Sequence, residues 1–329
     1  MTPSADRDSE PAQAVEARQL AVRAPAPAIH QNVRSGTAGW TDPTLIKSRR
    51  FYPSGVHRSA DRLGYYASQF SMVEVDATYY SLLPPAVAAR WASATPETFH
   101  FDVKAHPVLS GHPIDIGRLP SDLRELVQRA GHERRVYARD LSAELVHEME
   151  CRFRQLVEVL RDAKKLGCVM VQFPPWFRAT RGNGRRIERL AERLPDLPLA
   201  VEFRHPSWFE AERRDRLFSL LRSHRLSFIC VDEPNVVGGG VPPTTWVTNP
   251  ELAVVRFHGR NAAAWSRRGA TVQERFDYLY APEELRAWVE PVRRLSGEAR
   301  EVHAVFNNCV HDYAVVGAKG LCVLLGERE

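Results

Sequence analysis

The sequence predicts a single (β/α)8 barrel preceded by a disordered N-terminal tail. Eight short runs of apolar and β-branched residues alternate with longer amphipathic segments, as in repeated βα units around a parallel sheet. The composition stays uniform after residue 30, and a length of 329 residues fits one barrel, an architecture that commonly has about 250 residues or more. We therefore expect one barrel domain over residues 31–329 and a disordered tail over residues 1–30.

The N-terminal segment is rich in Ala, Pro, Gln and charge, and it shows no sustained period that would bury one face. Beyond it, each predicted strand is a short apolar run, and each predicted helix repeats apolar residues every three or four positions. The predicted strands are residues 36–40, 72–76, 99–104, 169–173, 199–203, 228–232, 254–258 and 302–306. The predicted helices are residues 60–70, 121–130, 142–166, 186–194, 213–224 and 283–295.

Charge and hydropathy exclude several classes of protein. Lys and Arg number 45 against 40 Asp and Glu, which gives a net charge of +5 and a pI near 9.0. A surplus this small, spread over the chain, argues against a dedicated nucleic-acid binder. Mean hydropathy is −0.35, and no apolar run approaches the roughly 18 residues of a membrane span. Because no basic and apolar leader opens the chain, we expect a cytoplasmic protein with no membrane partner. The sequence leaves the oligomeric state open.

Cysteine and glycine patterns bear on cofactors. The five cysteines form no CxxC or Cys/His zinc pattern, so we expect reduced thiols and no disulfide framework. No GxGxxG or Walker motif occurs, so a nucleotide cofactor has no support and no cofactor is predicted.

Polar residues recur at alternate positions near the ends of several predicted strands. Residues two apart in a strand share a face, and the positions between these polar residues are apolar. The apolar face suits the outer helices, so the polar face is expected to point into the barrel near the C-terminal strand ends, where barrel enzymes place their chemistry. The pairs are Glu74 and Asp76, Asp102 and Lys104, Glu202 and Arg204, and Arg256 and His258. Similarly placed are Gln172, Asp232, Asn307 and Asn308.

Three of these residues are candidate catalytic groups. Glu202 and His258 would form an acid/base pair, because both titrate and both lie on the usual catalytic face. Lys104 would stabilise an anion, with a Schiff-base nucleophile as the alternative. The candidate ligand-binding residues are Trp40, Glu74, Asp76, Tyr80, Gln172, Arg204, Asp232, Arg256, Arg260, Asn307 and Asn308. The alternative is that the charged members form ion pairs that hold the barrel and that the aromatic members only pack.

A divalent metal is a further alternative at the same strand ends. Carboxylates together with one imidazole suit Mn, Mg or Zn. The cations Lys104, Arg204 and Arg256 are expected in the same space and would repel a metal ion. We therefore assign no metal ligand and treat a divalent metal as an open alternative. The carboxylate and imidazole donors in question are Glu74, Asp76, Glu202, Asp232 and His258.

A series of motifs along the chain resembles one known family. They are GTAGW at 36–40, VEVDATYY at 73–80, FDVKA at 101–105, VQFPPWF at 171–177, VEFRHPSW at 201–208, RFHGR at 256–260 and FNN at 306–308. Over about residues 33–326 the chain resembles the YecE-like family, domain of unknown function 72. The resemblance implies a single barrel of the triosephosphate-isomerase type with the motif residues lining its top, and it supplies no established reaction. Ala38 and Asp76 replace the more usual Ser and Asn, and Asp76 adds a negative charge to the site.

Three functions fit these observations. The first is an enzyme that applies acid/base chemistry to a small anionic, phosphorylated or sugar-like ligand at the C-terminal face. The second is a metal-assisted phosphodiester hydrolase resembling a DNA-repair barrel, which needs a divalent ion and salt-sensitive nucleic-acid binding through Arg181 and Arg185. The third is a ligand-binding barrel without catalysis, which predicts saturable binding and no turnover. Because the residues constrain what binds more than which bond breaks, the first is the working hypothesis.

Overall fold

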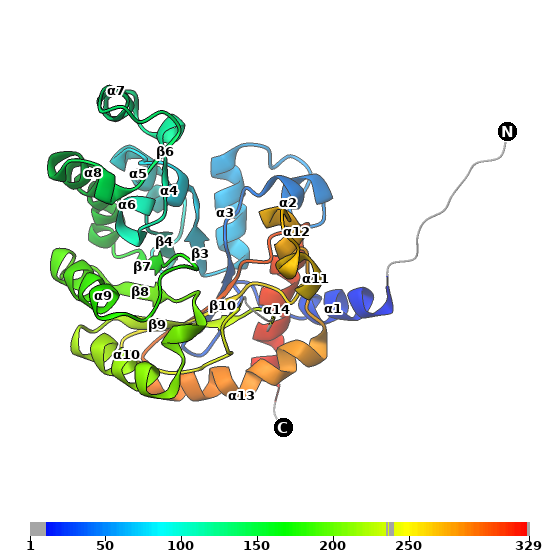
Figure 1. Cartoon of the computed structure of the whole chain (residues 1–329). Coiled ribbons are helices and arrows are strands. Elements are labelled where there is room, and N and C mark those ends of the chain that lie inside the picture. Colours follow the sequence, from blue (N-terminus) through cyan, green and yellow to red (C-terminus); the bar gives the residue numbers. More distant parts are fainter. Residues whose placement is uncertain (1–10, 235, 237–239, 328–329) are drawn as a thin grey trace.

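The computed structural model describes residues 11–234, 236 and 240–327 (Figure 1). Its centre is a curled sheet of nine strands with the order β1-β2-β11-β10-β9-β8-β7-β4-β3, and helices surround the sheet on its outer side. The strands are β1 Ile29–His30, β2 Val33–Thr37, β3 Met72–Val75, β4 His100–Lys104, β7 Leu166–Gln172, β8 Leu199–Glu202, β9 Ser227–Asp232, β10 Ala253–Phe257 and β11 Val302–Phe306. A separate antiparallel pair is formed by β5 Ile114–Asp115 and β6 Arg135–Val136.

The helices follow the strands in alternation, as the amphipathic segments predict. They are α1 Ala12–Val22, α2 Pro43–Ser48, α3 Ser59–Gln69, α4 Ala77–Tyr80, α5 Pro85–Ser93, α6 Pro107–Ser110, α7 Ser121–Arg129, α8 Ala143–Asp162, α9 Arg181–Arg193, α10 Ala211–Ser223, α11 Ala262–Ser266, α12 Val272–Phe276, α13 Pro282–Glu298 and α14 Tyr313–Gly326. Helix α8 illustrates how the local sequence determines where a helix begins and which face it buries. The Ser142 side chain accepts from the Leu145 N–H and begins the helix, and Met149, Phe153 and Leu156 fall on one buried stripe.

All eight predicted strands are present, and they run parallel to one another along the curled sheet, while the short β1 pairs antiparallel with β2. Boundaries shift by a few residues, as where the segment predicted as a helix up to residue 166 ends at Asp162 and β7 begins at Leu166. The six predicted helices are confirmed as α3, α7, α8, α9, α10 and α13.

Closure of the sheet differs from the prediction. Among the described residues no hydrogen-bonded ladder joins β2 to β3, and a single isolated bridge links Ala38 to Glu74. The Tyr66 hydroxyl of α3 lies between the two strands: it accepts from the Thr37 N–H at 2.8 Å and donates to the Met72 carbonyl at 3.2 Å. The structure is therefore a large curled mixed sheet, and a fully closed barrel is not confirmed. We call this junction of β2 and β3 the seam.

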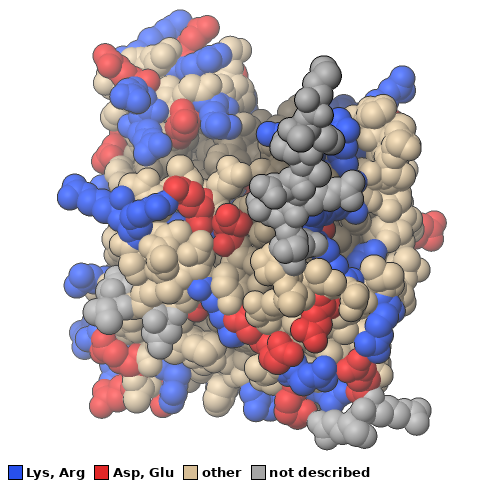
Figure 2. All heavy atoms as spheres, turned by 90° about the vertical axis from the view of Figure 1, so that its right-hand side faces the viewer, with Lys and Arg blue, Asp and Glu red and all other residues tan. Residues whose placement is uncertain are grey.

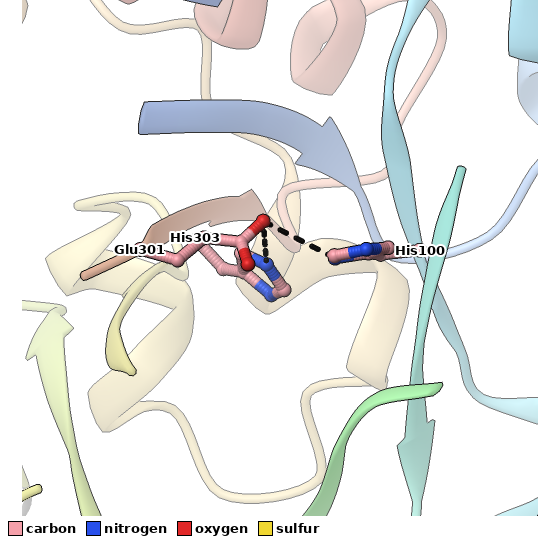
Figure 3. Close-up of side chains that lie close together, drawn as sticks. All are labelled: His100, Glu301 and His303. Atoms are coloured by element: carbon pink, nitrogen blue, oxygen red, sulfur yellow. Dashed lines mark ion pairs between the residues drawn. The ribbon is translucent and has the colours of Figure 1, made fainter. Parts of the chain in front are cut away.

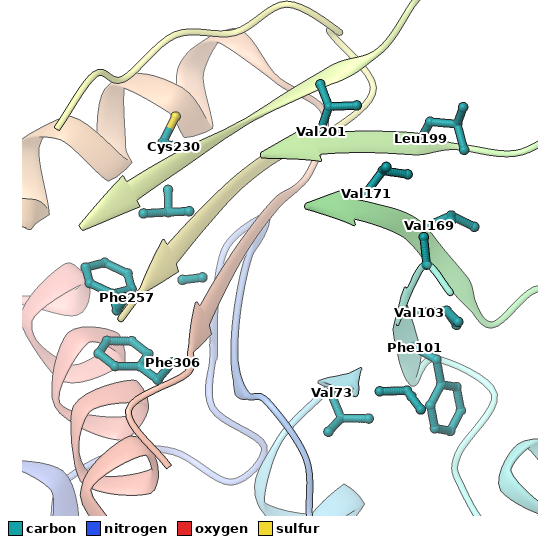
Figure 4. Packing of buried hydrophobic residues seen from close by; sticks show 14 of the residues in the cluster. Val73, Phe101, Val103, Val169, Val171, Leu199, Val201, Cys230, Phe257 and Phe306 are labelled. Atoms are coloured by element: carbon teal, nitrogen blue, oxygen red, sulfur yellow. The ribbon is translucent and has the colours of Figure 1, made fainter. Parts of the chain in front are cut away.

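Alternation along the strands separates two apolar layers. The residues predicted to face the helices, such as Val73, Phe101 and Val201, belong to the large core between sheet and helices (Figure 4). Phe257 and Phe306 extend this layer with stacked rings whose centroids are 4.3 Å apart. The inner side holds a smaller apolar cluster of Ala38, Met72, Cys168, Met170, Ala200, Ile229, Val231, Val241, Leu252, Val254 and Val305.

The N-terminal tail prediction is wrong for residues 12–30, while residues 1–10 lie outside the described part. Residues 12–22 form α1, which packs on α14. Ala17, Leu20 and Ala21 are buried at i, i+3 and i+4 spacing, which is one face of a helix. Arg18 also pairs with Asp312 at the start of α14. Because the stripe is short and mostly alanine, its period is weak in the sequence although the helix is well packed.

Surface charge is mixed on the face seen in Figure 2, where Lys and Arg lie among Asp and Glu. This distribution agrees with the small net charge of +5. In the part of the chain that the structure describes, no helix is long and apolar enough to cross a membrane.

We predict that Tyr66→Phe destabilises the fold by about 1–3 kcal/mol, because it leaves the buried Thr37 N–H and Met72 carbonyl without their partner at the seam. Urea unfolding measures the change in free energy. Tyr65→Phe is the matched control, since Tyr65 is a half-buried neighbour on the same helix. Equal stability of the two variants would show that the hydroxyl does not hold the seam.

Candidate functional site

A pocket of about 760 Å³ opens at the C-terminal ends of the parallel strands. Its floor carries polar side chains from successive strand ends, and its walls carry aromatic rings. The polar residues are Asp76, Lys104, Gln172, Arg204, His258 and Asn307. The aromatic residues are Trp40, Tyr79, Tyr80, Trp91 and Phe276. This is the face on which barrel enzymes carry their active sites.

Beneath the floor lies Arg256, whose guanidinium is fully buried. Its Nε and Nη2 donate to the two oxygens of Glu74 at 2.8 and 2.5 Å. Its Nη1 donates to Glu202 at 2.6 Å and to Gln172 at 3.1 Å. Glu74 and Glu202 are also fully buried, so water does not screen the attraction within this ion-pair group. A buried charge of this kind persists only when it is paired and hydrogen-bonded.

Glu202 connects this buried group to the pocket. One of its oxygens accepts from Arg256, and the other accepts from Arg204 at 2.9 Å and faces His258 Nε2 at 3.2 Å. Burial alone would favour the neutral carboxyl, but the charges of Arg256 and Arg204, together with the hydrogen bond from His258, outweigh it and hold the pKa of Glu202 well below its usual range. Glu202 is therefore an ionised acceptor held by its neighbours.

His258 is held in one tautomer by its two neighbours. With the Glu202 carboxylate at Nε2, that nitrogen carries the proton, and Nδ1 accepts from the Asn307 amide at 3.0 Å. Burial disfavours the imidazolium and lowers the pKa of His258 to about 3, with Glu202 opposing this only in part. His258 is thus neutral at physiological pH, with its lone pair on the nitrogen that faces Asn307.

Lys104 pairs with Asp76 at 3.2 Å across the pocket floor, and its Nζ lies 5.1 Å from the centroid of the Tyr79 ring. Burial alone would lower the pKa of Lys104, but the charge of Asp76 outweighs it and raises the pKa above its usual value. Burial likewise opposes the charge on Asp76, and Lys104 outweighs it to lower the pKa of Asp76. The amine therefore stays protonated, which suits a charge donor and disfavours a Schiff-base nucleophile.

Carboxylates outnumber cations in this group by four to three. Burial raises the pKa of Glu74 to about 8 even though Arg256 opposes the shift, so Glu74 holds a proton most readily. One such proton would balance the group. The carboxylates are Glu74, Asp76, Glu202 and Glu233, and the cations are Lys104, Arg204 and Arg256.

The structure brings most of the predicted site residues together, but at different depths. Trp40, Asp76, Tyr80, Gln172, Lys104, Arg204, His258 and Asn307 line the pocket. Glu74, Glu202 and Arg256 lie in the layer beneath it. Asp232, Arg260 and Asn308 do not line the pocket.

Asp232 is the clearest departure from the predicted placement. It accepts from Arg260 Nη2 at 2.8 Å and from the Tyr280 hydroxyl at 2.6 Å, and it lies on the strand face opposite Val231 of the inner cluster. The Tyr280 hydroxyl in turn accepts from the Gly259 N–H at 2.9 Å. This contact group anchors the loop after β10 from outside the sheet.

Asn308 also turns away from the pocket. It is fully buried, and its amide donates to the Tyr278 carbonyl at 2.8 Å, which holds the segment before α13.

Glu233 is the residue that the sequence prediction missed. It lies one position after β9, and its carboxylate pairs with Arg204 Nη2 at 3.0 Å, where Asp232 was expected. The other oxygen accepts from the Val241 N–H at 2.7 Å. The available signal was parity, because Ile229, Val231 and Glu233 share a face.

Two of the predicted carboxylates at this site, Glu202 and Asp76, are already engaged by cations, so a metal bound to them would have to displace those cations. Glu202 accepts from both Arg256 and Arg204, and Asp76 pairs with Lys104. Among the described residues, the donor atoms at this pocket form no group with metal-ligand spacing.

Comparison with known proteins places the chain in a family. A family model described as "Protein of unknown function DUF72" matches residues 34–329. The chain belongs to the DUF72 family. It is 31% identical over 276 residues to the UPF0759 protein YunF of Bacillus subtilis (strain 168), covering 83% of this chain and 87% of that protein. The resemblance to the YecE-like family, domain of unknown function 72, is thereby confirmed.

Solved structures of DUF72 proteins share the fold. A DUF72 protein of Enterococcus faecalis V583 matches with a TM-score of 0.73 at 29% identity, over 90% of this chain and 96% of that chain. A DUF72 protein of Thermotoga maritima MSB8 matches with a TM-score of 0.70 at 30% identity, over 90% of this chain and 99% of that chain. The names of these relatives state no ligand or reaction, so the function is argued from the pocket.

We predict that His258 makes the stability of this DUF72 protein weaken in acid. An unfolded histidine takes up a proton near its ordinary pKa of 6.5, whereas folded His258 does so near 3, so the unfolded state binds more protons between these values. The free energy of unfolding of wild type, relative to His258→Asn, should therefore fall below about pH 6.5 by up to about 1.4 kcal/mol per pH unit.

Urea unfolding across this pH range measures the difference, with His57→Asn at an exposed position as the control that tracks wild type. Parallel curves for wild type and His258→Asn would contradict the neutral, buried state of His258.

Proposed function

We propose that this protein is an enzyme that transfers a proton on a small anionic, phosphorylated or sugar-like ligand bound in the strand-end pocket. The observation that carries the proposal is the convergence of Lys104, Arg204 and His258 on one floor, below walls of aromatic rings. Pockets of a few hundred Å³ with apolar walls and a small number of fixed polar groups are typical ligand sites.

The cations on the floor favour an anionic group on the ligand. Lys104 is protonated, and both it and Arg204 expose part of their side chains, at 14% and 13%. Each already has a carboxylate partner, so charge alone gives a ligand little advantage. A ligand that also offers hydroxyl groups gains more, because Asn307 and Gln172 supply amide donors and acceptors beside the cations.

Trp40 supports the same class of ligand. Its indole N–H is buried and has no hydrogen-bond partner among the described residues, although the ring lines the pocket. A buried donor without an acceptor costs about 1–3 kcal/mol, so an oxygen atom placed there would be stabilised. The ring plane itself can pack against the apolar face of a sugar.

His258 is the proposed proton acceptor, through Nδ1. A ligand hydroxyl or acidic C–H that displaces the Asn307 amide would meet the lone pair of Nδ1. The imidazolium that forms would be stabilised at Nε2 by the Glu202 carboxylate 3.2 Å away. The lowered pKa of His258 keeps the ring neutral, so Nδ1 carries a lone pair at physiological pH.

Glu202 takes a different part from the one expected of it. Glu202 is fully buried, and both of its oxygens are already occupied, one by Arg256 and the other by Arg204 and His258, so no oxygen is left to take a proton from a ligand. We assign Glu202 to positioning His258 and Arg204. The acid/base pair predicted from the sequence is thus replaced by His258 as base and Glu202 as the group that stabilises its charged form.

We predict that a small anionic ligand raises the melting temperature of the wild-type chain and that Lys104→Met loses most of this ligand-induced shift. Ligands that bind the native state stabilise it by mass action, so thermal denaturation against sugar phosphates, sugar acids, inorganic phosphate and short DNA reads affinity without assuming a reaction. Lys47→Met, at an exposed position outside the pocket, is the matched control.

The outcomes separate the candidate functions. A shift with a sugar phosphate or sugar acid that only Lys104→Met abolishes supports the proposal, and a shift only with DNA favours the phosphodiester hydrolase. Turnover separates an enzyme from a binding protein. His258→Asn should retain the thermal shift and lose conversion of the ligand, followed by NMR. If wild type binds the ligand but returns it unchanged, the protein is a ligand-binding protein without catalysis.

A further inference from the structure

A second polar group lies near the beginnings of the strands, at the opposite edge of the sheet from the pocket. It contains His100 at the start of β4, His303 in β11, and Glu301 just before β11 (Figure 3). Figure 3 shows the ion pairs that one Glu301 oxygen forms with each of the two imidazole rings. Glu301 Oε1 is 3.2 Å from His100 Nδ1 and 3.3 Å from His303 Nε2.

These distances match the edges of a metal coordination shell. Two atoms bound at about 2.0–2.1 Å to a tetrahedral ion lie about 3.3 Å apart. The donor atoms of the three residues all lie within 4.8 Å of one another. Two histidines and one carboxylate form a ligand set that zinc sites use, with a fourth position for water.

The direction of the nitrogen atoms distinguishes this arrangement from an ordinary hydrogen-bonded group. His100 Nδ1 and His303 Nε2 are buried, and neither has a hydrogen-bond partner among the described residues. Both therefore come close to the Glu301 oxygen without pointing along a hydrogen bond to it. Two ring nitrogens that lie beside one carboxylate and have no hydrogen-bond partner of their own are suited to bind a shared ion.

Asp102 completes the pattern. Its two oxygens lie 3.0 and 2.9 Å from His303 Nδ1, and Asp102 is fully buried. A carboxylate at one ring nitrogen fixes the proton there and leaves the other nitrogen free to bind metal, as in carboxylate–histidine–zinc triads. Arg34 donates to Glu301 Oε1 and holds the carboxylate in place, and the second lone pair of that oxygen remains for the ion.

We propose that His100 Nδ1, His303 Nε2 and the Glu301 carboxylate bind a divalent transition metal of the zinc class. The site is accessible, because the side chains of His100 and Glu301 are 20% and 18% exposed. The ion would link β4 to β11, the strands that flank β3 and β2 at the seam. Its role is structural: it ties the sheet together where the ladder is missing.

A proton is the competing occupant. Burial lowers the pKa of His303, but Asp102 and Glu301 outweigh it and raise the pKa to about 9. Metal ligands must be deprotonated, so binding releases protons and is best measured in mildly alkaline buffer. Without a metal, protonated His303 would form ion pairs with both Asp102 and Glu301.

We predict that the chelator-stripped full chain binds one equivalent of Zn²⁺ and melts at a higher temperature when loaded. Zn²⁺ content is measured by mass spectrometry, affinity by calorimetry, and Co²⁺ in place of Zn²⁺ should give the absorption bands of a tetrahedral ion. His100→Ala removes a partly exposed ligand and should lose the ion, the bands and the Zn²⁺-dependent thermal shift. Asp102→Asn should weaken binding by about 10–100-fold.

Two controls locate the ion. His57→Ala, at an exposed position, and His258→Asn, in the pocket, should both bind Zn²⁺ like wild type. Absence of Zn²⁺ binding by wild type would overturn the proposal and leave the ion-pair chain. Equal binding by wild type and His100→Ala would overturn it as well, and loss in His258→Asn would move the ion to the pocket. Because His100→Ala spares the fully buried His303 and Asp102, the comparison does not depend on a variant that fails to fold.

Discussion

Arg256 places the strictest demand on the interior of this protein, because a guanidinium with no exposure to water must be paired on every side that it presents. Glu74 and Glu202 meet this demand from β3 and β8, and Gln172 from β7. Removing one partner of such a buried pair typically costs about 3–5 kcal/mol. These contacts therefore hold β3, β7 and β8 in one register at their C-terminal ends. The same contacts fix the positions of the side chains on the pocket floor above them.

The two histidines inside the sheet reach opposite protonation states by the same rules. His258 shares Glu202 with Arg256 and Arg204, so the carboxylate is already engaged and burial keeps the imidazole neutral. His303 lies between Asp102 and Glu301, and two carboxylates overcome burial and favour the charged ring. The two groups meet at one point, because Glu74 of the first and Asp102 of the second are register partners on the neighbouring strands β3 and β4.

The alternation of residues along a strand made much of the site predictable. In β3, β8 and β10 one face is wholly apolar, so the charged residues all lie on the other face. The prediction failed in β9, where Phe228 and Cys230 on one face are as apolar as Ile229 and Val231 on the other. Because both faces of β9 are equally apolar, the pattern does not show whether Asp232 or Glu233 faces the site. The prediction named Asp232, whereas Glu233 pairs with Arg204.

The alternation of residues along a strand also does not predict how deep each side chain lies relative to the pocket floor. Residues on one face, such as Glu74 and Asp76, differ by two positions along a strand, which decides whether a side chain lies below the floor or in the pocket. The helix of residues 12–22 was missed because an alanine stripe buries little apolar surface and has a weak period, although contact with α14 suffices to hold it.

The seam between β2 and β3 shows why sequence patterns could not predict whether the sheet closes. Gly36 allows β2 to approach β3 closely, since a Cβ there would lie 2.5 Å from the Met72 carbonyl oxygen. At that separation the Tyr66 hydroxyl takes the place of ladder hydrogen bonds. Periodicity describes one segment at a time, whereas this junction depends on a glycine, a carbonyl and a helical side chain from three segments. The seam also ends at the pocket, where Trp40 follows β2 and Asp76 follows β3, so the walls on these two sides are joined by side chains and not by a continuous sheet.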